Sequence, residues 1–286
     1  MASLKEIKAR IASVQSTEKI TAAMRMVASA KLHRTQMMTQ NFLLYIEELN
    51  SIVNSLGGMA EKSGGAEHRC VALLPISSSS GLCGAFNSNI VKETFSIIDT
   101  YKAKGVEVRL FPIGKKISRE LKKGHIDANL DFQLIADGVG KEDVVANCRK
   151  LVNFLDSLLV KGEIDGVEFI YHHFVSMGKQ VITRDMLALE VPRIQEIRKE
   201  DQEYITEPSP AELMAELHPK MLNSKVYSIL LDSVTSEHAA RMLAMQTADD
   251  NAKELLQELT LLYNKSRQQA ITNELIDIMG GKTQEG

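Results

Sequence analysis

The chain has 286 residues, of which 44% are hydrophobic and 25% are charged, and its formal net charge is −3 at pH 7. This composition excludes an intrinsically disordered protein, and the small negative charge argues against a general affinity for nucleic acid or anionic lipid. The apolar runs fall short of the ~18 residues that a membrane-spanning helix needs, and the charged N-terminal segment lacks a signal-peptide core.

Residues 1–58 are predicted to form one long helix. Ser3 stands three residues before Glu6, the spacing of a capping box at a helix start. No proline interrupts residues 1–56, so the helix is expected to extend roughly 80 Å before it ends at Gly57 and Gly58. Its apolar residues form a narrow seam of the coiled-coil type, which is predicted to comprise Leu4, Ile7, Ile11 and Val14 and then to shift to Ile20, Met24 and Val27.

Residues 66–206 are predicted to form a Rossmann-like α/β domain, because strand and helix patterns alternate there. A buried strand at 71–76 is followed by a small-residue turn and by a helix over about 88–104. The unit then repeats, with strands expected at 106–113 and 130–136 and helices at 115–123 and 143–160. Such alternation predicts a largely parallel sheet with helices packed on it. Two last strands, 167–175 and 180–189, are predicted to close the sheet as an antiparallel hairpin.

Residues 209–281 are predicted to form a second long helix, after a return marked by Pro192, Pro208, Pro210 and Pro219. Its seam is predicted to comprise Met245, Ala248, Ala252, Leu255, Leu259 and Leu262, followed by Ile271, Leu275 and Ile278. Two such seams can bury only each other or a partner, so the N- and C-terminal helices are expected to form a long antiparallel coiled coil. By periodicity alone, the simpler interpretation is a coiled coil that only holds the α/β domain in place.

The turn at 77–87 is the place where a doubly wound sheet would cradle a phosphate. It lacks both the glycine spacing of a dinucleotide fold and the lysine of a P-loop, which favours a plain strand-to-helix turn. Cys83 has no base or acid in its motif and is expected to be a small buried thiol.

The pair His172–His173 is not expected to bind one metal ion, because adjacent strand residues point to opposite faces. Both side chains are instead expected to be partly exposed. Cys70, Cys83 and Cys148 show neither paired spacing nor a metal-ligand pattern, so no metal site is expected and a reduced setting fits.

Charge is unevenly distributed along the chain. Residues 1–40 are basic, whereas residues 196–216 are acidic. A run of like charge is usually a solvated face. It is interpreted as a binding surface only when a partner of opposite charge is known.

Four motifs identify the chain as similar to a known family. They are IASVQSTEKITAAMRMVASAKL near the start, GLCGAFNSNI at 81–90, YITEP at 204–208, and SEHAARMLAMQTADDNA with YNKSRQQAITNEL near the end. In this order they resemble the gamma subunit of the F-type ATP synthase, over nearly the whole chain. The match begins near residue 3, which leaves no room for a mitochondrial transit peptide, so a bacterial protein is implied. The chain departs from the family at Ser77 to Ser80, where charged residues are usual.

The resemblance implies a non-catalytic rotor shaft that needs no cofactor and binds no nucleic acid. It implies a peripheral place on the cytoplasmic face of the bacterial inner membrane, with three alpha and three beta subunits, an epsilon subunit and a ring of c subunits as partners. By resemblance, Met24, Arg241, Gln268 and Thr272 contact the beta subunits, and Tyr204 and Glu207 contact the c ring and epsilon. A coiled-coil scaffold and a nucleotide-dependent enzyme remain as alternatives.

Overall fold

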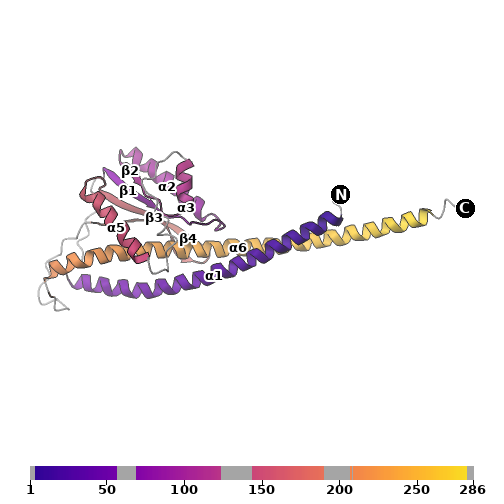
Figure 1. The fold of residues 1–286 in the computed structure, drawn as a ribbon, viewed down its shortest axis with the longest axis horizontal. Helices are drawn as coiled ribbons and strands as arrows, with labels where there is room; N and C mark the ends of the chain where they lie inside the picture. Colours follow the sequence, from indigo (N-terminus) through magenta and orange to yellow (C-terminus); the bar gives the residue numbers. More distant parts are fainter. Residues whose placement is uncertain (1–3, 57–68, 124–143, 190–206, 208, 282–286) are drawn as a thin grey trace. The chain divides into compact units, whose positions relative to one another are not determined.

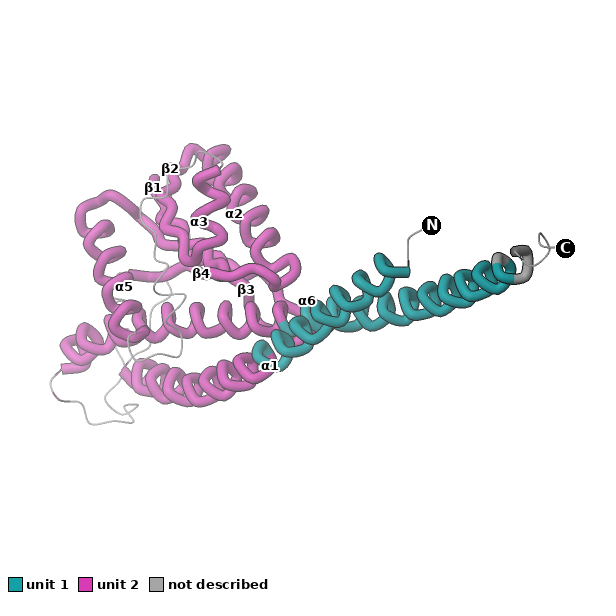
Figure 2. The backbone as a smooth tube through the Cα atoms, turned by 45° about the vertical axis from the view of Figure 1, so that its right-hand side comes forward, with its two compact units in different colours: residues 1–28, 242–286 teal, residues 29–241 magenta. Residues whose placement is uncertain are grey.

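The structure is a computed structural model that describes residues 4–56, 69–123, 144–189, 207 and 209–281. The chain divides into two compact units (Figure 2). Unit 1 contains Met1–Ala28 and Met242–Gly286, and unit 2 contains Ser29–Arg241. None of the helices within these described ranges is long and apolar enough to cross a bilayer.

Helix α1 spans Leu4–Ser55, as its uninterrupted helical pattern predicts, whereas the expected cap Ser3 lies outside the described residues. Its inward positions follow a strict heptad from one end to the other, with spacings of four and three residues. In unit 1 the buried or half-buried members are Ile7, Ile11, Val14, Glu18, Thr21, Arg25 and Ala28. The predicted shift of the seam to Ile20 and Val27 is wrong, because these side chains are 60% and 56% exposed.

Helix α6 spans Pro210–Gly281. A reciprocal capping box starts it: Ser209 N donates to Glu212 Oε2 at 3.1 Å, and Glu212 N donates to Ser209 Oγ at 3.3 Å. Pro210 occupies the first helical position, where its missing N–H costs nothing. Pro219 does not delay the start of the helix but lies inside it, at an exposed position.

Within unit 2, α1 and α6 contact each other and run in opposite directions. The Phe42 and Tyr227 rings meet edge to face, with centroids 4.7 Å apart. Farther along α1 and earlier on α6, a separate apolar cluster joins Leu49, Val53 and Leu56 to Met214 and Leu217. Later residues of α1 therefore contact earlier residues of α6, as in any antiparallel pair of helices.

Unit 2 also contains a four-stranded sheet in the order β2-β1-β3-β4 (Figure 1). The strands are β1 (Cys70–Pro75), β2 (Glu107–Leu110), β3 (Gly166–Ser176) and β4 (Lys179–Met186). β1 pairs in parallel with β2 and β3, and β4 pairs antiparallel with β3, which confirms the predicted parallel sheet and closing hairpin. β2 is shorter than the predicted strand at 106–113, and the predicted strand at 130–136 lies outside the described residues.

Helices cover both faces of this sheet. Alternate residues of a strand point to opposite faces, so neighbouring strand residues pack against different helices. On one face Leu73 packs with α2 (Phe86–Ala103) and α3 (Lys115–Lys123). On the other face Ala72 and Leu74 pack with α5 (Val144–Val160) and with α6. The α6 residues in this core are Leu222, Val226, Ile229 and Leu230. The C-terminal helix is thus an integral layer of the α/β domain, which its seam pattern did not predict.

Candidate functional site

The outer surface of unit 1 is unusually apolar for two surface helices. Ile20, Met26 and Val27 are exposed on α1, and Leu243, Leu255, Leu261 and Leu262 are exposed on α6. From Ile271 onward, every α6 side chain that the structure describes is exposed, including Leu275, Ile276 and Ile278. An accumulation of exposed large apolar side chains is typical of a surface that binds a partner.

These apolar side chains face outward because the seam uses neighbouring positions, several of which are polar. In unit 1 the four-three seam of α6 comprises Met245, Asp249, Ala252, Leu256, Leu259, Tyr263, Ser266 and Ala270, all of them buried or half-buried. Beside the start of this seam, Met242, Ala244, Gln246 and Ala248 are half-buried as well. The predicted seam positions Ala248, Leu255 and Leu262 are each displaced by one residue, to Asp249, Leu256 and Tyr263. The predicted continuation through Ile271, Leu275 and Ile278 is wrong, since all three are exposed.

Asp249 is the centre of a polar layer in this seam. Its side chain is fully buried, and its Oδ2 lies 3.4 Å from Arg25 Nη1 and 2.9 Å from Lys253 Nζ. Arg25 also donates to Gln246 Oε1, and Gln246 Nε2 donates to Asp250 Oδ2 at 2.9 Å. A buried carboxylate is tolerated only with such partners, because desolvation of an unpaired charge is costly.

Three of the residues predicted to contact a partner lie in unit 1. Met24 is half-buried beside Arg25, whereas Gln268 and Thr272 are exposed one turn apart on α6. Thr272 Oγ1 donates to the Gln268 carbonyl at 2.9 Å. Arg25 meets Asp249, so Met24 lies roughly 30 Å along α6 from Gln268 at 1.5 Å per residue. The three residues therefore mark two separate levels of the helix pair.

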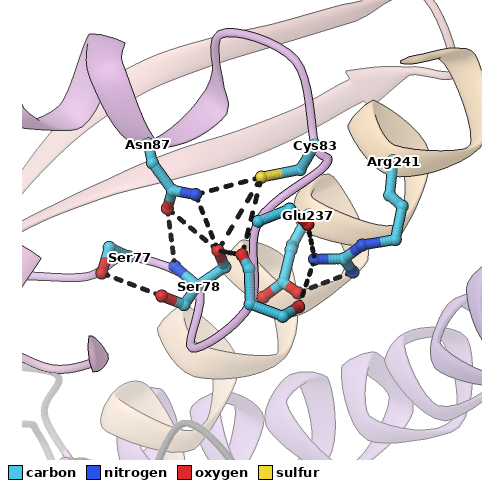
Figure 3. A network of polar contacts seen from close by, with 8 residues as sticks. Ser77, Ser78, Cys83, Asn87, Glu237 and Arg241 are labelled. Atoms are coloured by element: carbon cyan, nitrogen blue, oxygen red, sulfur yellow. Dashed lines mark hydrogen bonds and ion pairs between the residues drawn. The ribbon is translucent and has the colours of Figure 1, made fainter. Parts of the chain in front are cut away.

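Arg241, the fourth predicted contact residue, is engaged within unit 2 (Figure 3). Its guanidinium lies 2.7 Å from Glu237 Oε1, and its Nη2 donates to Ser80 Oγ at 2.7 Å and to the Gly81 carbonyl at 3.4 Å. The side chain is only 11% exposed. In the isolated chain, Arg241 thus connects α6 with the turn at 77–87 after β1, which is called the serine turn below.

Most polar groups of the serine turn bind one another (Figure 3), although Ser79 Oγ is buried without a hydrogen-bond partner among the described residues. Ser78 N donates to Asn87 Oδ1 at 3.0 Å, and Asn87 Nδ2 donates to Cys83 Sγ at 3.1 Å. Ser77 Oγ accepts from Ile117 N at 3.0 Å. A Cβ on Gly114 would lie 2.2 Å from the Ser77 carbonyl oxygen, so only glycine fits there. These contacts support the prediction of a plain strand-to-helix turn.

The two adjacent histidines point to opposite faces, as predicted, but His172 is buried and not partly exposed. Its ring stacks on Phe86 with centroids 4.2 Å apart, and burial lowers its pKa to about 4. His173 is exposed, and its Nδ1 lies 2.6 Å from Asp232 Oδ2. The error arose because the residues that cover the end of β3 come from α2, far away in the sequence.

The three cysteines are free and buried, which confirms the expectation for Cys83. Burial raises the pKa of Cys148 to about 12, so this thiol is inert. Across the described ranges, no group of three His, Cys, Asp or Glu residues is arranged to hold a metal ion. Of the remaining predicted contacts, Glu207 is exposed and Tyr204 lies outside the described residues.

Two features of the candidate site were not predicted from the sequence: the polar layer around Asp249 and the contact of Arg241 with the serine turn. The first had a signal in the sequence, because Arg25 and Asp249 both continue heptads that start at apolar residues. The second had none, since nothing in a sequence shows that residue 241 meets residue 80.

Comparison with known proteins gives a consistent answer over the whole chain. A family model described as ATP synthase matches residues 3–283. The ATP synthase gamma chain of Parabacteroides distasonis is 51% identical over 98% of both chains, and that of Phocaeicola vulgatus is 47% identical over 98% of this chain and 99% of the relative. The fold is similar to a chain of the Euglena gracilis mitochondrial ATP synthase rotor, with a TM-score of 0.66 at 16% identity, covering 94% of this chain and 98% of that one.

Proposed function

Because the chain belongs to the ATP synthase gamma-chain family, we propose that it turns as the central shaft of a rotary ATP synthase. In this role it couples proton flow through a membrane c ring to ATP synthesis and hydrolysis at the catalytic beta subunits. The proposed partners are three alpha and three beta subunits around unit 1, and an epsilon subunit and the c ring at the α/β domain. The chain itself contributes contacts and no catalytic group. Its proposed place is peripheral, on the cytoplasmic face of the bacterial membrane.

The construction of unit 1 is the observation that carries this proposal. It consists of two unlike helical segments with exposed apolar side chains, so it has no threefold symmetry. Three chemically identical sites around such a shaft each meet a different face of it. Their nucleotide affinities then differ, and rotation moves each site through its states in turn, because a conformational change needs differential contacts.

We further propose that α1 and α6 form one antiparallel coiled coil, with the helical segments at 1–58 and 209–281 and the α/β domain at 66–206. The four-three seam along α1, and along α6 from Met245 onward, supports this geometry. So do the Arg25–Asp249 pair in unit 1 and the Phe42–Tyr227 contact in unit 2.

The proposed beta-subunit contacts are Met24, Gln268 and Thr272 in unit 1. Their positions on two levels of the helix pair suit an elongated partner surface. The exposed basic residues Lys5, Lys8, Arg10 and Lys19 flank them and suit an acidic segment of the partner.

Glu237 and Ser80 already bind Arg241. Arg241 is therefore proposed to contact the beta subunit only when it gives up one of these two contacts. Glu207, which is exposed, and Tyr204 are proposed to contact the c ring and epsilon.

Single-molecule rotation tests the proposal. The chain is co-expressed with its alpha and beta subunits, the ring is anchored, and a probe is fixed to the α/β domain. Unidirectional stepping that requires ATP is the expected result. A motionless probe on an assembled complex would favour the scaffold alternative, and shortening both helices by matched heptads would then leave activity intact.

A further inference from the structure

Each helical segment of unit 1 offers two seams that compete for the same partner. Both seams share every seventh residue. From each shared residue the next member of the occupied seam lies four residues ahead, whereas the next member of the second seam lies three residues ahead. The second seam keeps Thr21 and Ala28 on α1, and Met245, Ala252 and Leu259 on α6. It replaces Arg25 by Met24, and it replaces Asp249, Leu256 and Tyr263 by Ala248, Leu255 and Leu262.

The two seams differ by a small rotation of each helix about its own axis. At 3.6 residues per turn, a change from a four-residue to a three-residue spacing moves the centre of the seam by roughly 50°. Around Arg25 and Asp249, hydrophobicity alone favours the second seam, because it exchanges Arg25 for a methionine and Asp249 for an alanine. The molecule nevertheless exposes Leu255 and Leu262, at 43% and 47%.

The polar layer explains why the less apolar seam is occupied. Asp249 is fully buried and is bound by Arg25 from the other helix and by Lys253 from the next turn of its own helix. Arg25 also binds Gln246 on the preceding turn of α6. Rotation to the second seam would separate Arg25 from both α6 partners, and a charged group at a seam position is known to fix pairing geometry in coiled coils.

We propose that Arg25 and Asp249 are positioning residues that set the rotational orientation of the two helices of unit 1. Their pairing keeps the apolar stripe formed by Leu255 and Leu262 out of the helix seam and available to the surrounding subunits. The setting of the helices follows from unit 1 alone, and only the use of the stripe by partner subunits rests on the proposed function.

Thiol labelling of the full-length chain measures this orientation directly. Leu255 is exposed and Leu256 is half-buried, so cysteines at these adjacent positions replace the same side chain on two different faces. The three native cysteines are buried, and the chain without an added cysteine gives the background. With Arg25 and Asp249 intact, we expect maleimide to label Leu255→Cys several-fold faster than Leu256→Cys.

The test variant combines Arg25→Ala with Asp249→Ala, which removes the polar layer without adding apolar volume to the occupied seam. We expect the labelling ratio to fall to about one or below as Leu255 turns inward. Glu258→Ala is the matched control, because it removes an exposed carboxylate of the same helix away from the polar layer, and it should keep the original ratio. Asp249→Glu retains the charge and should keep it as well.

An unchanged ratio in the double alanine variant would overturn the proposal. If that variant loses its helical circular dichroism, Asp249→Asn takes its place, since it keeps the size of the side chain and removes only the charge, and the same fall in the ratio is expected. An unchanged ratio in a folded Asp249→Asn chain would be equally damaging.

The functional consequence is measured in membranes that carry the assembled complex, as protons pumped per ATP hydrolysed. We expect the double alanine variant to pump several-fold less per ATP, and Glu258→Ala to match the parent. A changed labelling ratio with unchanged pumping would leave the positioning role standing and would refute the use of the stripe by partner subunits. A rotation assay on the parent chain separates that result from a failure of the proposed function itself.

Discussion

Helix α6 has different surroundings in the two units of this molecule. In unit 2, α6 buries Val226, Ile229, Leu230 and Leu231 because α1 and the sheet with α5 cover different sides of it. In unit 1, α6 buries only a narrow line of residues, and beyond Ile271 no described side chain is buried. Unit 2 is therefore where the chain stabilises itself, and unit 1 is where it offers surface to others.

Truncation of one leucine in each unit gives the largest expected contrast. Leu230 is fully buried in the domain core, so Leu230→Ala should lower the free energy of unfolding by about 2–5 kcal/mol. Leu261 in unit 1 is 71% exposed, and Leu261→Ala should change it by less than about 0.5 kcal/mol. Urea denaturation of the full-length chain measures both, and equal losses would contradict the division of roles.

Acid should destabilise unit 2 more than unit 1, because every histidine of the chain lies outside the ranges of unit 1. Burial lowers the pKa of His172 and of His238 from 6.5 to about 4, so both are neutral in the folded chain near pH 5 while the unfolded chain binds their protons. Their stabilising contribution is complete above pH 6.5 and is lost as the pH falls toward 4. By linkage the loss is about 2 kcal/mol for each histidine between pH 7.5 and pH 5.

Hydrogen exchange measured by mass spectrometry at pH 7.5 and pH 5, after correction for the intrinsic exchange rate, tests this difference. Protection should fall in β3 and in the part of α6 around His238, and it should persist around Asp249. His172→Gln should reduce the acid sensitivity of unit 2. A parallel loss of protection in both units would show that the histidines do not cause it.

Met24→Lys tests a half-buried position of unit 1 beside Arg25. The new ammonium is expected to form an ion pair with an acidic segment of the proposed beta subunit, and this pair must break at every step of rotation. Pumping per ATP should fall several-fold while assembly survives. Ala23→Lys is the control, because Ala23 is the exposed neighbour and carries the same new charge to another face. Unchanged pumping in the Met24 variant would remove this residue from the contact.

Glu207→Lys should have the smallest effect of the four, confined to coupling. Charge reversal at this exposed position is expected to weaken contact with the c ring and to lower ATP-driven pumping roughly two-fold, with little change in hydrolysis by the detached soluble part. Glu216→Lys makes the same charge change at another exposed site and should leave both activities unchanged. Equal losses in pumping and in soluble hydrolysis would argue against the proposed location of Glu207.

The alternating pattern of the central segment was sufficient to predict most of unit 2. β1, α2, α3, α5 and the hairpin all lie within a few residues of their predicted bounds, because each has its own periodicity and turn residues. The burial of His172 was not predictable in this way. Phe86 and Ser236 contact it from two helices that are distant in sequence, through ring stacking and through a hydrogen bond of 2.9 Å to its carbonyl.

By itself, the sequence determined that two long helices flank a parallel-sheet domain, and its motifs determined the family. It did not determine which faces of the helices meet, because a helical period of 3.6 residues lies between three and four and both spacings produce an apolar line. Only the tertiary structure decided between them. It buries Asp249 against Arg25, since a paired charge in the seam fixes one rotation of the helices, and it leaves Leu255 and Leu262 exposed.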